Sequence, residues 1–243
     1  MNTKTIIYWI SVALVFSMIS CNGQQVEEET TEPAANEWVS LFDGSDLEHW
    51  RGYNLDEVPD GWDIEGDELV FTPPEDDGDM HGRDLMTREQ YSDFELEIEW
   101  NISQGGNSGI FYFVLEQSER EIYWSAPEMQ VLDNEHHPDA TQGVDGNRKS
   151  GSLYDLVPAD PQNFNGYGEW NSVRIISDGN HVEHWQNGEK VLEYERNTPE
   201  WFDMLHDSKF NCYPEFGALR EGHIALQDHG DIVRYRNIRI REL

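Results

Sequence analysis

The sequence predicts an antiparallel β-sandwich with one short helix. Short segments recur in which apolar and polar residues alternate, and the clearest runs from Phe94 to Ile102. A two-residue period places one face of a strand in a core and the other face in water. Glycine and asparagine residues separate these segments, and only one segment carries the start signals of a helix.

Nine segments are expected to form strands. Asp178-Gly179-Asn180 and Asn187-Gly188 predict hairpin turns, because glycine and asparagine accept the positive φ that tight turns need. A meander is therefore expected over 172–194. In the last segment the apolar phase slips, which predicts a bulge near Asn237. The nine segments are 68–72, 94–102, 109–115, 128–132, 172–177, 181–186, 190–194, 223–227 and 232–240.

One helix is expected after the meander. Thr198 can cap it, Pro199 suits its first position, and it should run to about His206. Residues 37–243 suffice for one domain, and their strand number and spacing fit a concanavalin-type jelly roll better than an immunoglobulin fold. The expected fold class is thus all-β, a concanavalin-like jelly-roll β-sandwich with one short helix.

The N-terminus predicts a lipoprotein. Residues 1–20 carry a single charge, Lys4, and an apolar stretch that ends before Cys21, as in a signal peptide with a lipobox. The alternative is an ordinary signal peptide with an incidental cysteine. Residues 21–36 are polar and acidic and are expected to form a disordered tether. We expect a lipid-anchored envelope protein, with periplasmic or outer-membrane surface display left open.

Net charge limits the kinds of ligand that the protein can bind, and cysteine content limits its disulfides. The formal net charge of −33 repels polyphosphate backbones, which argues against nucleic acid and favours neutral or cationic ligands. The chain has two cysteines. If Cys21 carries lipid, Cys212 has no partner and the domain has no internal disulfide. The sequence does not indicate an oligomeric state.

The densest polar cluster follows Pro127. Alternation places Glu128 and Gln130 on one face of a strand, with Met129 and Val131 on the other. If the apolar face enters the core, Glu128 and Gln130 line a groove, where a partly desolvated carboxylate can act as an acid or base. The alternative is a solvent-facing edge.

A loop with possible metal ligands follows this strand. Asp133 and His137, with Glu135 and His136 between them, offer oxygen and imidazole ligands for a divalent metal. The spacing matches no fixed metal signature, so turn residues satisfied by local hydrogen bonds are the alternative.

Further candidates lie in other polar segments. Gln227 and His229 lie at the end of an expected strand, where a histidine can exchange protons or be purely structural. Asparagine, arginine and exposed tryptophan can bind sugar hydroxyls or stack on sugar faces. The candidates of this kind are Asn107, Arg148, Trp170 and Asn171.

Taken in order, the motifs resemble the 3-keto-disaccharide hydrolase family, formerly domain of unknown function 1080. The resemblance covers 38–243, and it is the ordered series of motifs that is specific. The segments are WVSLFDGSDLEHW, YSDFELEIEW, GGNSGIFY, PEMQVLDNEHHPDA, GSLYDL, GEWN, HVEHWQNG, PEW, GHIALQDHG and NIRIREL.

The resemblance implies a concanavalin-like sandwich that acts on glycosides oxidised at C3 of the sugar. A C3 ketone acidifies the C2 hydrogen, so elimination of the C1 aglycone and addition of water give net hydrolysis. The enolate needs hydrogen-bond donors or a metal. On this reading Glu128 is the acid/base, Gln130 and Gln227 bind hydroxyls or the oxyanion, and Tyr154 protonates the leaving group. His137 and His229 shuttle protons or bind metal.

Two alternatives come from other classes. A non-catalytic carbohydrate-binding module is one, because sandwiches of this shape often only bind sugars. A retaining glycosidase acting on unmodified sugar is the other, and it needs two carboxylates about 5 Å apart. The sequence supplies one strong candidate carboxylate, Glu128.

Overall fold

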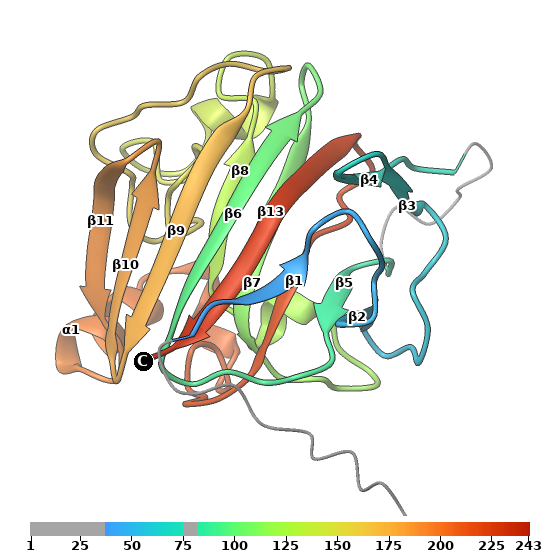
Figure 1. The fold of residues 1–243 in the computed structure, drawn as a ribbon. Helices are drawn as coiled ribbons and strands as arrows, with labels where there is room; N and C mark the ends of the chain where they lie inside the picture. The colour runs from blue at the N-terminus through green and yellow to red at the C-terminus, as the bar shows by residue number, and fades with distance from the viewer. Residues whose placement is uncertain (1–36, 75–81) are drawn as a thin grey trace, which may run out of the picture. The chain divides into compact units, whose positions relative to one another are not determined.

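Residues 37–74 and 82–243 are described by a computed structural model, shown in Figure 1. The expected signal peptide, Cys21 and the tether lie outside these residues. Within them, no helix is long and apolar enough to cross a membrane. The described residues form two antiparallel sheets, as the alternating pattern predicts.

The larger sheet has eight strands. Seven lie in the order β11-β10-β9-β6-β13-β4-β3, and β1 pairs with β13 beside β4. Their bounds are β1 Val39–Phe42, β3 Trp62–Glu65, β4 Glu68–Phe71, β6 Phe94–Ile102, β9 Asn171–Asp178, β10 His181–Gln186, β11 Glu189–Glu195 and β13 Val233–Glu242.

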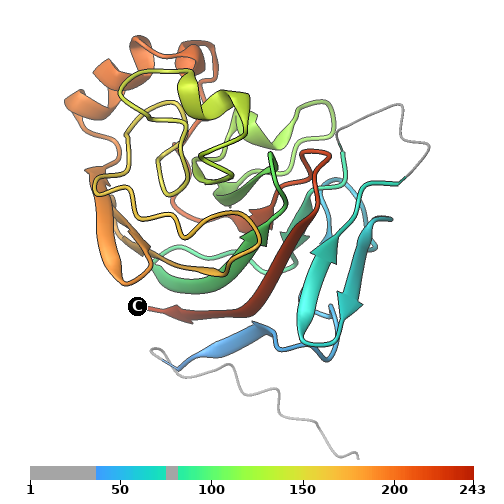
Figure 2. The same ribbon diagram turned by 90° about the horizontal axis from the view of Figure 1, so that it is seen from above.

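The smaller sheet has five strands in the order β2-β5-β12-β7-β8. Short helices and loops lie on its outer side, away from β1 and β13 (Figure 2). The strands are β2 Trp50–Gly52, β5 Leu85–Thr87, β7 Asn107–Val114, β8 Glu128–Leu132 and β12 His223–Leu226. The helices are α1 Pro199–His206 and the 3-10 helices η1 Ile122–Trp124, η2 Pro138–Thr141 and η3 Lys209–Cys212.

The nine predicted strands all occur, with ends shifted by at most two residues. The helix is also confirmed, since Thr198 caps α1 by accepting a hydrogen bond from the backbone N–H of Trp201 at 3.1 Å. Sequence reasoning missed β1, β2, β3 and β5. Each of these strands has three or four residues, which is too short for an alternating pattern to stand out.

The predicted bulge marks a change of partner along β13. Asn237 has φ 52°, and the register of β13 against β6 shifts between Arg236 and Arg239. Residues before the bulge pair with β4, and residues after it pair with β1. The bulge therefore lets the long strand β13 pair first with β4 and then with β1 along the same edge.

The hydrophobic core lies between the sheets. Met129 and Val131 of β8 and Ile98 and Trp100 of β6 are buried in the same cluster. Their strand neighbours point to the outer faces, because alternate side chains leave a sheet on opposite sides. Glu128 and Gln130 consequently lie on the outer face of the smaller sheet.

Candidate active site

Three adjacent strands bring the predicted polar residues together. β7 pairs with β8 so that Gly109 lies opposite Gln130 and Phe111 lies opposite Glu128. β12 adjoins the other edge of β7, and the backbone N–H of Gln227 donates to the carbonyl of Gly109 at 2.9 Å. The outer face of β7, β8 and β12 thus forms the floor of one site.

A cavity of about 310 Å³ lies over this floor. Six of the sequence-predicted residues line it: Asn107, Glu128, Gln130, Tyr154, Gln227 and His229. The other lining residues are Asp84, Glu121, Ile122, Tyr123, Ala126, Lys209, Phe210, Tyr213, Phe216 and Asp228. The volume falls in the range of small-molecule sites.

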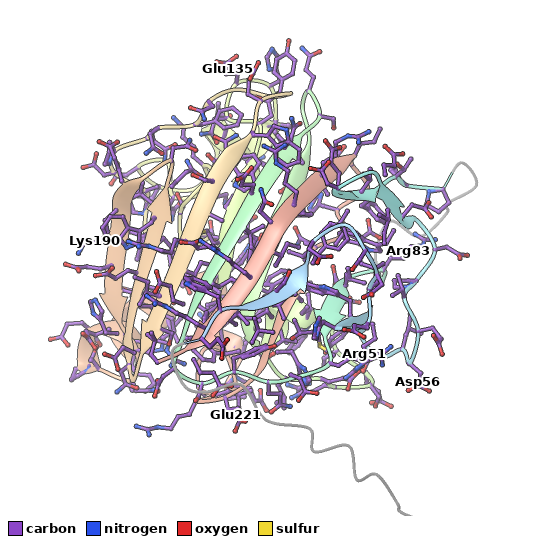
Figure 3. All side chains as sticks on the ribbon, viewed as in Figure 1. Arg51, Asp56, Arg83, Glu135, Lys190 and Glu221 are labelled. Carbon is purple, nitrogen blue, oxygen red and sulfur yellow. The ribbon has the colours of Figure 1, made fainter. Side chains whose placement is uncertain are left out.

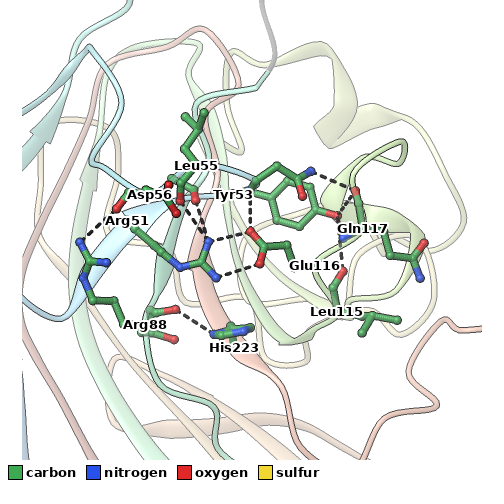
Figure 4. A network of polar contacts seen from close by, with 12 residues as sticks. Arg51, Tyr53, Leu55, Asp56, Arg88, Leu115, Glu116, Gln117 and His223 are labelled. Atoms are coloured by element: carbon green, nitrogen blue, oxygen red, sulfur yellow. Dashed lines mark hydrogen bonds and ion pairs between the residues drawn. The ribbon is translucent and has the colours of Figure 1, made fainter.

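One wall is carried by η1, and Figure 4 shows how the loop before it is held. Arg51 forms a two-pronged ion pair with Glu116, with nitrogen–oxygen distances of 2.6 and 2.9 Å. The Tyr53 hydroxyl accepts a hydrogen bond from the backbone N–H of Gln117 and donates to the carbonyl of Arg120, each at 3.1 Å. These contacts fix the loop that leads to Ile122 and Tyr123.

Glu128 of β8 is a buried carboxyl group on this floor, 7% exposed. Burial raises its pKa to about 8, while the positive charge of Lys209 acts in the opposite direction. In the amide orientation that satisfies both ends of Gln130, its Nε2 donates to Glu128 Oε1 and to the Ser108 carbonyl, each at 3.0 Å. Glu128 can therefore exchange a proton near neutral pH.

Asp84 is a second buried carboxyl group in the cavity, which sequence reasoning missed. Its Oδ1 accepts the backbone N–H of Asp228 at 2.9 Å. Burial raises its pKa to about 7, and the nearby charge of Asp228 acts in the same direction. Asp84 directly precedes the short, unpredicted strand β5, so no pattern drew attention to it.

Two side-chain oxygens in the cavity have unmet hydrogen-bonding capacity. Asn107 Oδ1 and Gln227 Oε1 are buried and have no hydrogen-bond partner within the described part of the chain. A buried acceptor without a partner is unfavourable. Both oxygens are suited to accept hydrogen bonds from the hydroxyl groups of a bound sugar.

A polar wall carries Tyr154. Its hydroxyl donates to Asp139 Oδ2 at 3.0 Å, and burial raises its pKa. Arg148 does not line the cavity. It pairs with Asp139 and Asp155 and lies over the Tyr154 ring at 5.5 Å, so it supports the wall from behind. Lys209 of η3, also missed from sequence, lies over the same ring.

Three more predicted site residues lie outside the cavity lining. The ring of His137 is next to that of His229, with centroids 6.3 Å apart, but His137 is outside the cavity lining. Trp170 and Asn171, predicted to bind substrate, also lie outside the cavity lining. Asn171 is buried in the larger sheet, where its Oδ1 accepts from Asn165 and Asn187, and Trp170 stacks against Arg236.

Among the described residues, the loop after β8 does not bring three possible metal ligands together. Asp133 accepts the backbone N–H groups of Gly105 and Glu135 and pairs with His136. His137 Nδ1 accepts the backbone N–H of Asp139 at 3.2 Å, as the cap of η2. Both carboxylate oxygens of Asp133 and Nδ1 of His137 are thus engaged in shaping the turn.

A larger groove, of about 790 Å³, lies on the outer face of the larger sheet, which faces the viewer in Figure 3. Several of its charges are already paired, as between Arg239 and Glu97, and Arg174 covers the ring of Trp185 at 4.3 Å. We place the chemistry in the smaller cavity because the buried carboxyl groups and the unpartnered amide oxygens converge there.

Comparisons with known proteins show the family to which the chain belongs. The family model of the 3-keto-alpha-glucoside-1,2-lyase-like domain matches residues 37–241. The chain is 39% identical to a 3-keto-disaccharide hydrolase of Bacteroides thetaiotaomicron, over 99% of each chain. Among solved structures, two candidate glycosyl hydrolases of Parabacteroides distasonis are similar. One has 28% identity and a TM-score of 0.77, covering 85% of this chain and 94% of that one. The other has 25% identity and a TM-score of 0.68, covering 86% and 100%.

Proposed function

The chain belongs to the family of the 3-keto-alpha-glucoside-1,2-lyase-like domain, and we propose from this premise that it eliminates the C1 aglycone of 3-keto-glycosides and then adds water. It is a glycoside-cleaving enzyme that acts on 3-keto sugars. The elimination route and the roles of the residues below are our proposal.

The route begins at the C2 hydrogen. Glu128, as a carboxylate, takes this proton, and the electron pair forms an enolate whose charge lies on O3. Collapse of the enolate expels the aglycone oxygen, which takes a proton, and leaves a C1–C2 double bond. Water then adds its hydroxyl group to C1 while a proton returns to C2. The sum is hydrolysis of the glycosidic bond.

The observation that carries this proposal is the burial of Glu128 in a cavity with unpartnered acceptors. Its pKa of about 8 gives a strong base whose carboxylate form is accessible near neutral pH. Asn107 and Gln227 supply the acceptors for sugar hydroxyls. Two groups of the cavity can supply the proton of the leaving group, the predicted Tyr154 and the buried carboxyl of Asp84.

The test is turnover of 3-keto-trehalose by the purified protein, with unoxidised trehalose as control. We expect released glucose from the keto sugar alone. Binding without product would indicate a carbohydrate-binding module, and cleavage of the unoxidised sugar would indicate an ordinary glycosidase. Glu128→Gln should abolish turnover, and full activity of this variant would exclude Glu128 as the base.

We further propose that the enzyme is lipid-anchored through Cys21 at the cell envelope. The support is the lipobox-like segment that ends at Ser20 and the polar stretch that follows the cysteine. Incorporation of a labelled fatty acid into the full chain, compared with Cys21→Ser, tests the anchor. Protease treatment of intact cells then separates surface display from periplasmic display.

A further inference from the structure

Lys209 is the one lysine among the described residues that line the cavity, and neither the family match nor the relatives' names give it a role. It lies in η3, whose N-cap Ser208 accepts the backbone N–H of Phe210 at 3.1 Å. This cap fixes the turn from which the Lys209 side chain extends. The ammonium Nζ lies 4.0 Å from the centroid of the Tyr154 ring.

The charge of Lys209 is weakly compensated. Within the described residues its ion pair is with Asp155, at 3.9 Å, and Asp155 is also bound closely by Arg148. A contact of 3.9 Å is too long for a direct hydrogen bond, so donors of the ammonium remain free for a ligand. The aromatic faces of Tyr154 and Phe210 hold the cation without consuming these donors.

The other polar side chains of the cavity are mostly carboxyls, amides and phenols. A cavity of this kind has a base for the C2 proton and neutral donors, and a cationic donor stabilises developing negative charge more strongly than these do. We propose that Lys209 is a further catalytic residue, whose ammonium donates a hydrogen bond to O3 of the enolate formed when C2 loses its proton. This inference rests on the proposed function.

In this step the C2–H bond breaks, its proton passes to Glu128 and its electron pair moves toward O3. Lys209 keeps its proton and forms no covalent bond. Burial lowers the pKa of Lys209, which strengthens the ammonium as a hydrogen-bond donor. Lys209 and Glu128 are also coupled, because the ammonium charge lowers the pKa of Glu128.

The test uses a substrate that can enolise but cannot eliminate, a 3-keto-1,5-anhydroglucitol, which has no aglycone at C1. Exchange of its C2 hydrogen for deuterium in D₂O, followed by NMR, reports enolisation alone. We expect Lys209→Met to lower this exchange rate about 100-fold or more, as loss of an oxyanion donor does, with little change in KM. The methionine keeps the stem that packs on Tyr154.

Two variants complete the design. Lys209→Arg keeps a cationic donor and should restore most of the exchange. Lys190→Met is the matched control, because Lys190 pairs with Glu183 and Glu193 at the β10–β11 edge of the other sheet (Figure 3) and should exchange like the wild type. The limb of the pH–rate profile assigned to Glu128 should move to higher pH in Lys209→Met and stay in place in Lys190→Met.

Wild-type exchange in Lys209→Met would overturn the inference, and so would a loss confined to KM. Trapping of a sugar adduct on Lys209 by cyanoborohydride would also overturn it, because the lysine would then act through an imine. If the wild-type protein fails to cleave 3-keto-trehalose, the proposed function itself fails. Normal cleavage together with normal exchange in Lys209→Met removes only the role of Lys209.

Discussion

Gly109 makes the space that the Glu128 carboxylate occupies. A Cβ atom on residue 109 would lie 2.2 Å from Glu128 Oε1 and 2.7 Å from its carboxyl carbon. Residue 109 is the diagonal cross-strand neighbour of residue 128, since Phe111 is the direct one. The base proposed here therefore depends on a residue that has no side chain.

Gly109→Ala should displace this carboxylate and lower kcat about 100-fold, because misplacement of a reacting group by about 1 Å has an effect of that order. It should also lower the free energy of unfolding by about 1–3 kcal/mol through crowding. The control is the same substitution in a Glu128→Ala background. In that background, denaturant titration should show almost no loss of unfolding free energy on Gly109→Ala. Equal losses in the two backgrounds would contradict a steric conflict between residues 109 and 128.

Glu128→Gln should inactivate the enzyme and yet stabilise it. The folded-state pKa of Glu128 is about 8 and the ordinary value is 4.5, so between these values the native protein holds a proton that the unfolded chain has released. Stability from this site is complete below about pH 4.5 and falls as pH rises to 8, at about 1.4 kcal/mol per pH unit. Glutamine does not titrate.

The difference in unfolding free energy between Glu128→Gln and wild type should therefore grow with pH, reaching roughly 3 kcal/mol at pH 7 relative to pH 4.5. Chemical denaturation at several pH values measures it. Asp84 titrates in both proteins, and its charge contributes to the raised pKa of Glu128. A difference that does not vary with pH would show that the carboxyl group ionises normally in the fold.

Gln227→Met should weaken substrate binding without lowering the thermal stability of the protein. The substitution removes a buried oxygen that has no hydrogen-bond partner within the described residues, while keeping a side chain of similar length. We expect unchanged or slightly higher thermal stability, with KM for a 3-keto-glycoside raised about tenfold, the effect of losing one hydrogen bond of about 1.4 kcal/mol. A clear loss of thermal stability would mean that the Gln227 side chain stabilises the fold in the absence of a ligand.

Alternation along single strands predicted much of the fold and part of the site. Glu128 and Gln130 could be placed on one face because β8 spans five residues with a regular period. Asp84 and Lys209 could not be found in this way, because one precedes a three-residue strand and the other begins a 3-10 helix. Their approach to Glu128 depends on contacts between segments far apart in the sequence. Trp170 lies away from the cavity, which could not be predicted because a sequence does not show which sheet a motif joins.

The source of the leaving-group proton can be decided between Asp84 and Tyr154. Asp84→Asn keeps an oxygen that can accept the backbone N–H of Asp228, so its fold should persist. With a pKa of about 7, Asp84 holds its proton in about half of the molecules at neutral pH, whereas the Tyr154 hydroxyl already donates to Asp139. We therefore expect Asp84 to be the donor.

A leaving group that needs no proton provides the control. Asp84→Asn should cleave a 3-keto alkyl glucoside about 100-fold more slowly than wild type, the usual effect of losing a general acid. Its cleavage of a 3-keto nitrophenyl glucoside should be nearly normal, because nitrophenolate leaves without protonation. Tyr154→Phe should show no such difference between the two substrates. If Tyr154→Phe shows this difference and Asp84→Asn does not, Tyr154 is the donor. Only the loss of the residue that protonates the aglycone should slow a basic leaving group more than nitrophenolate.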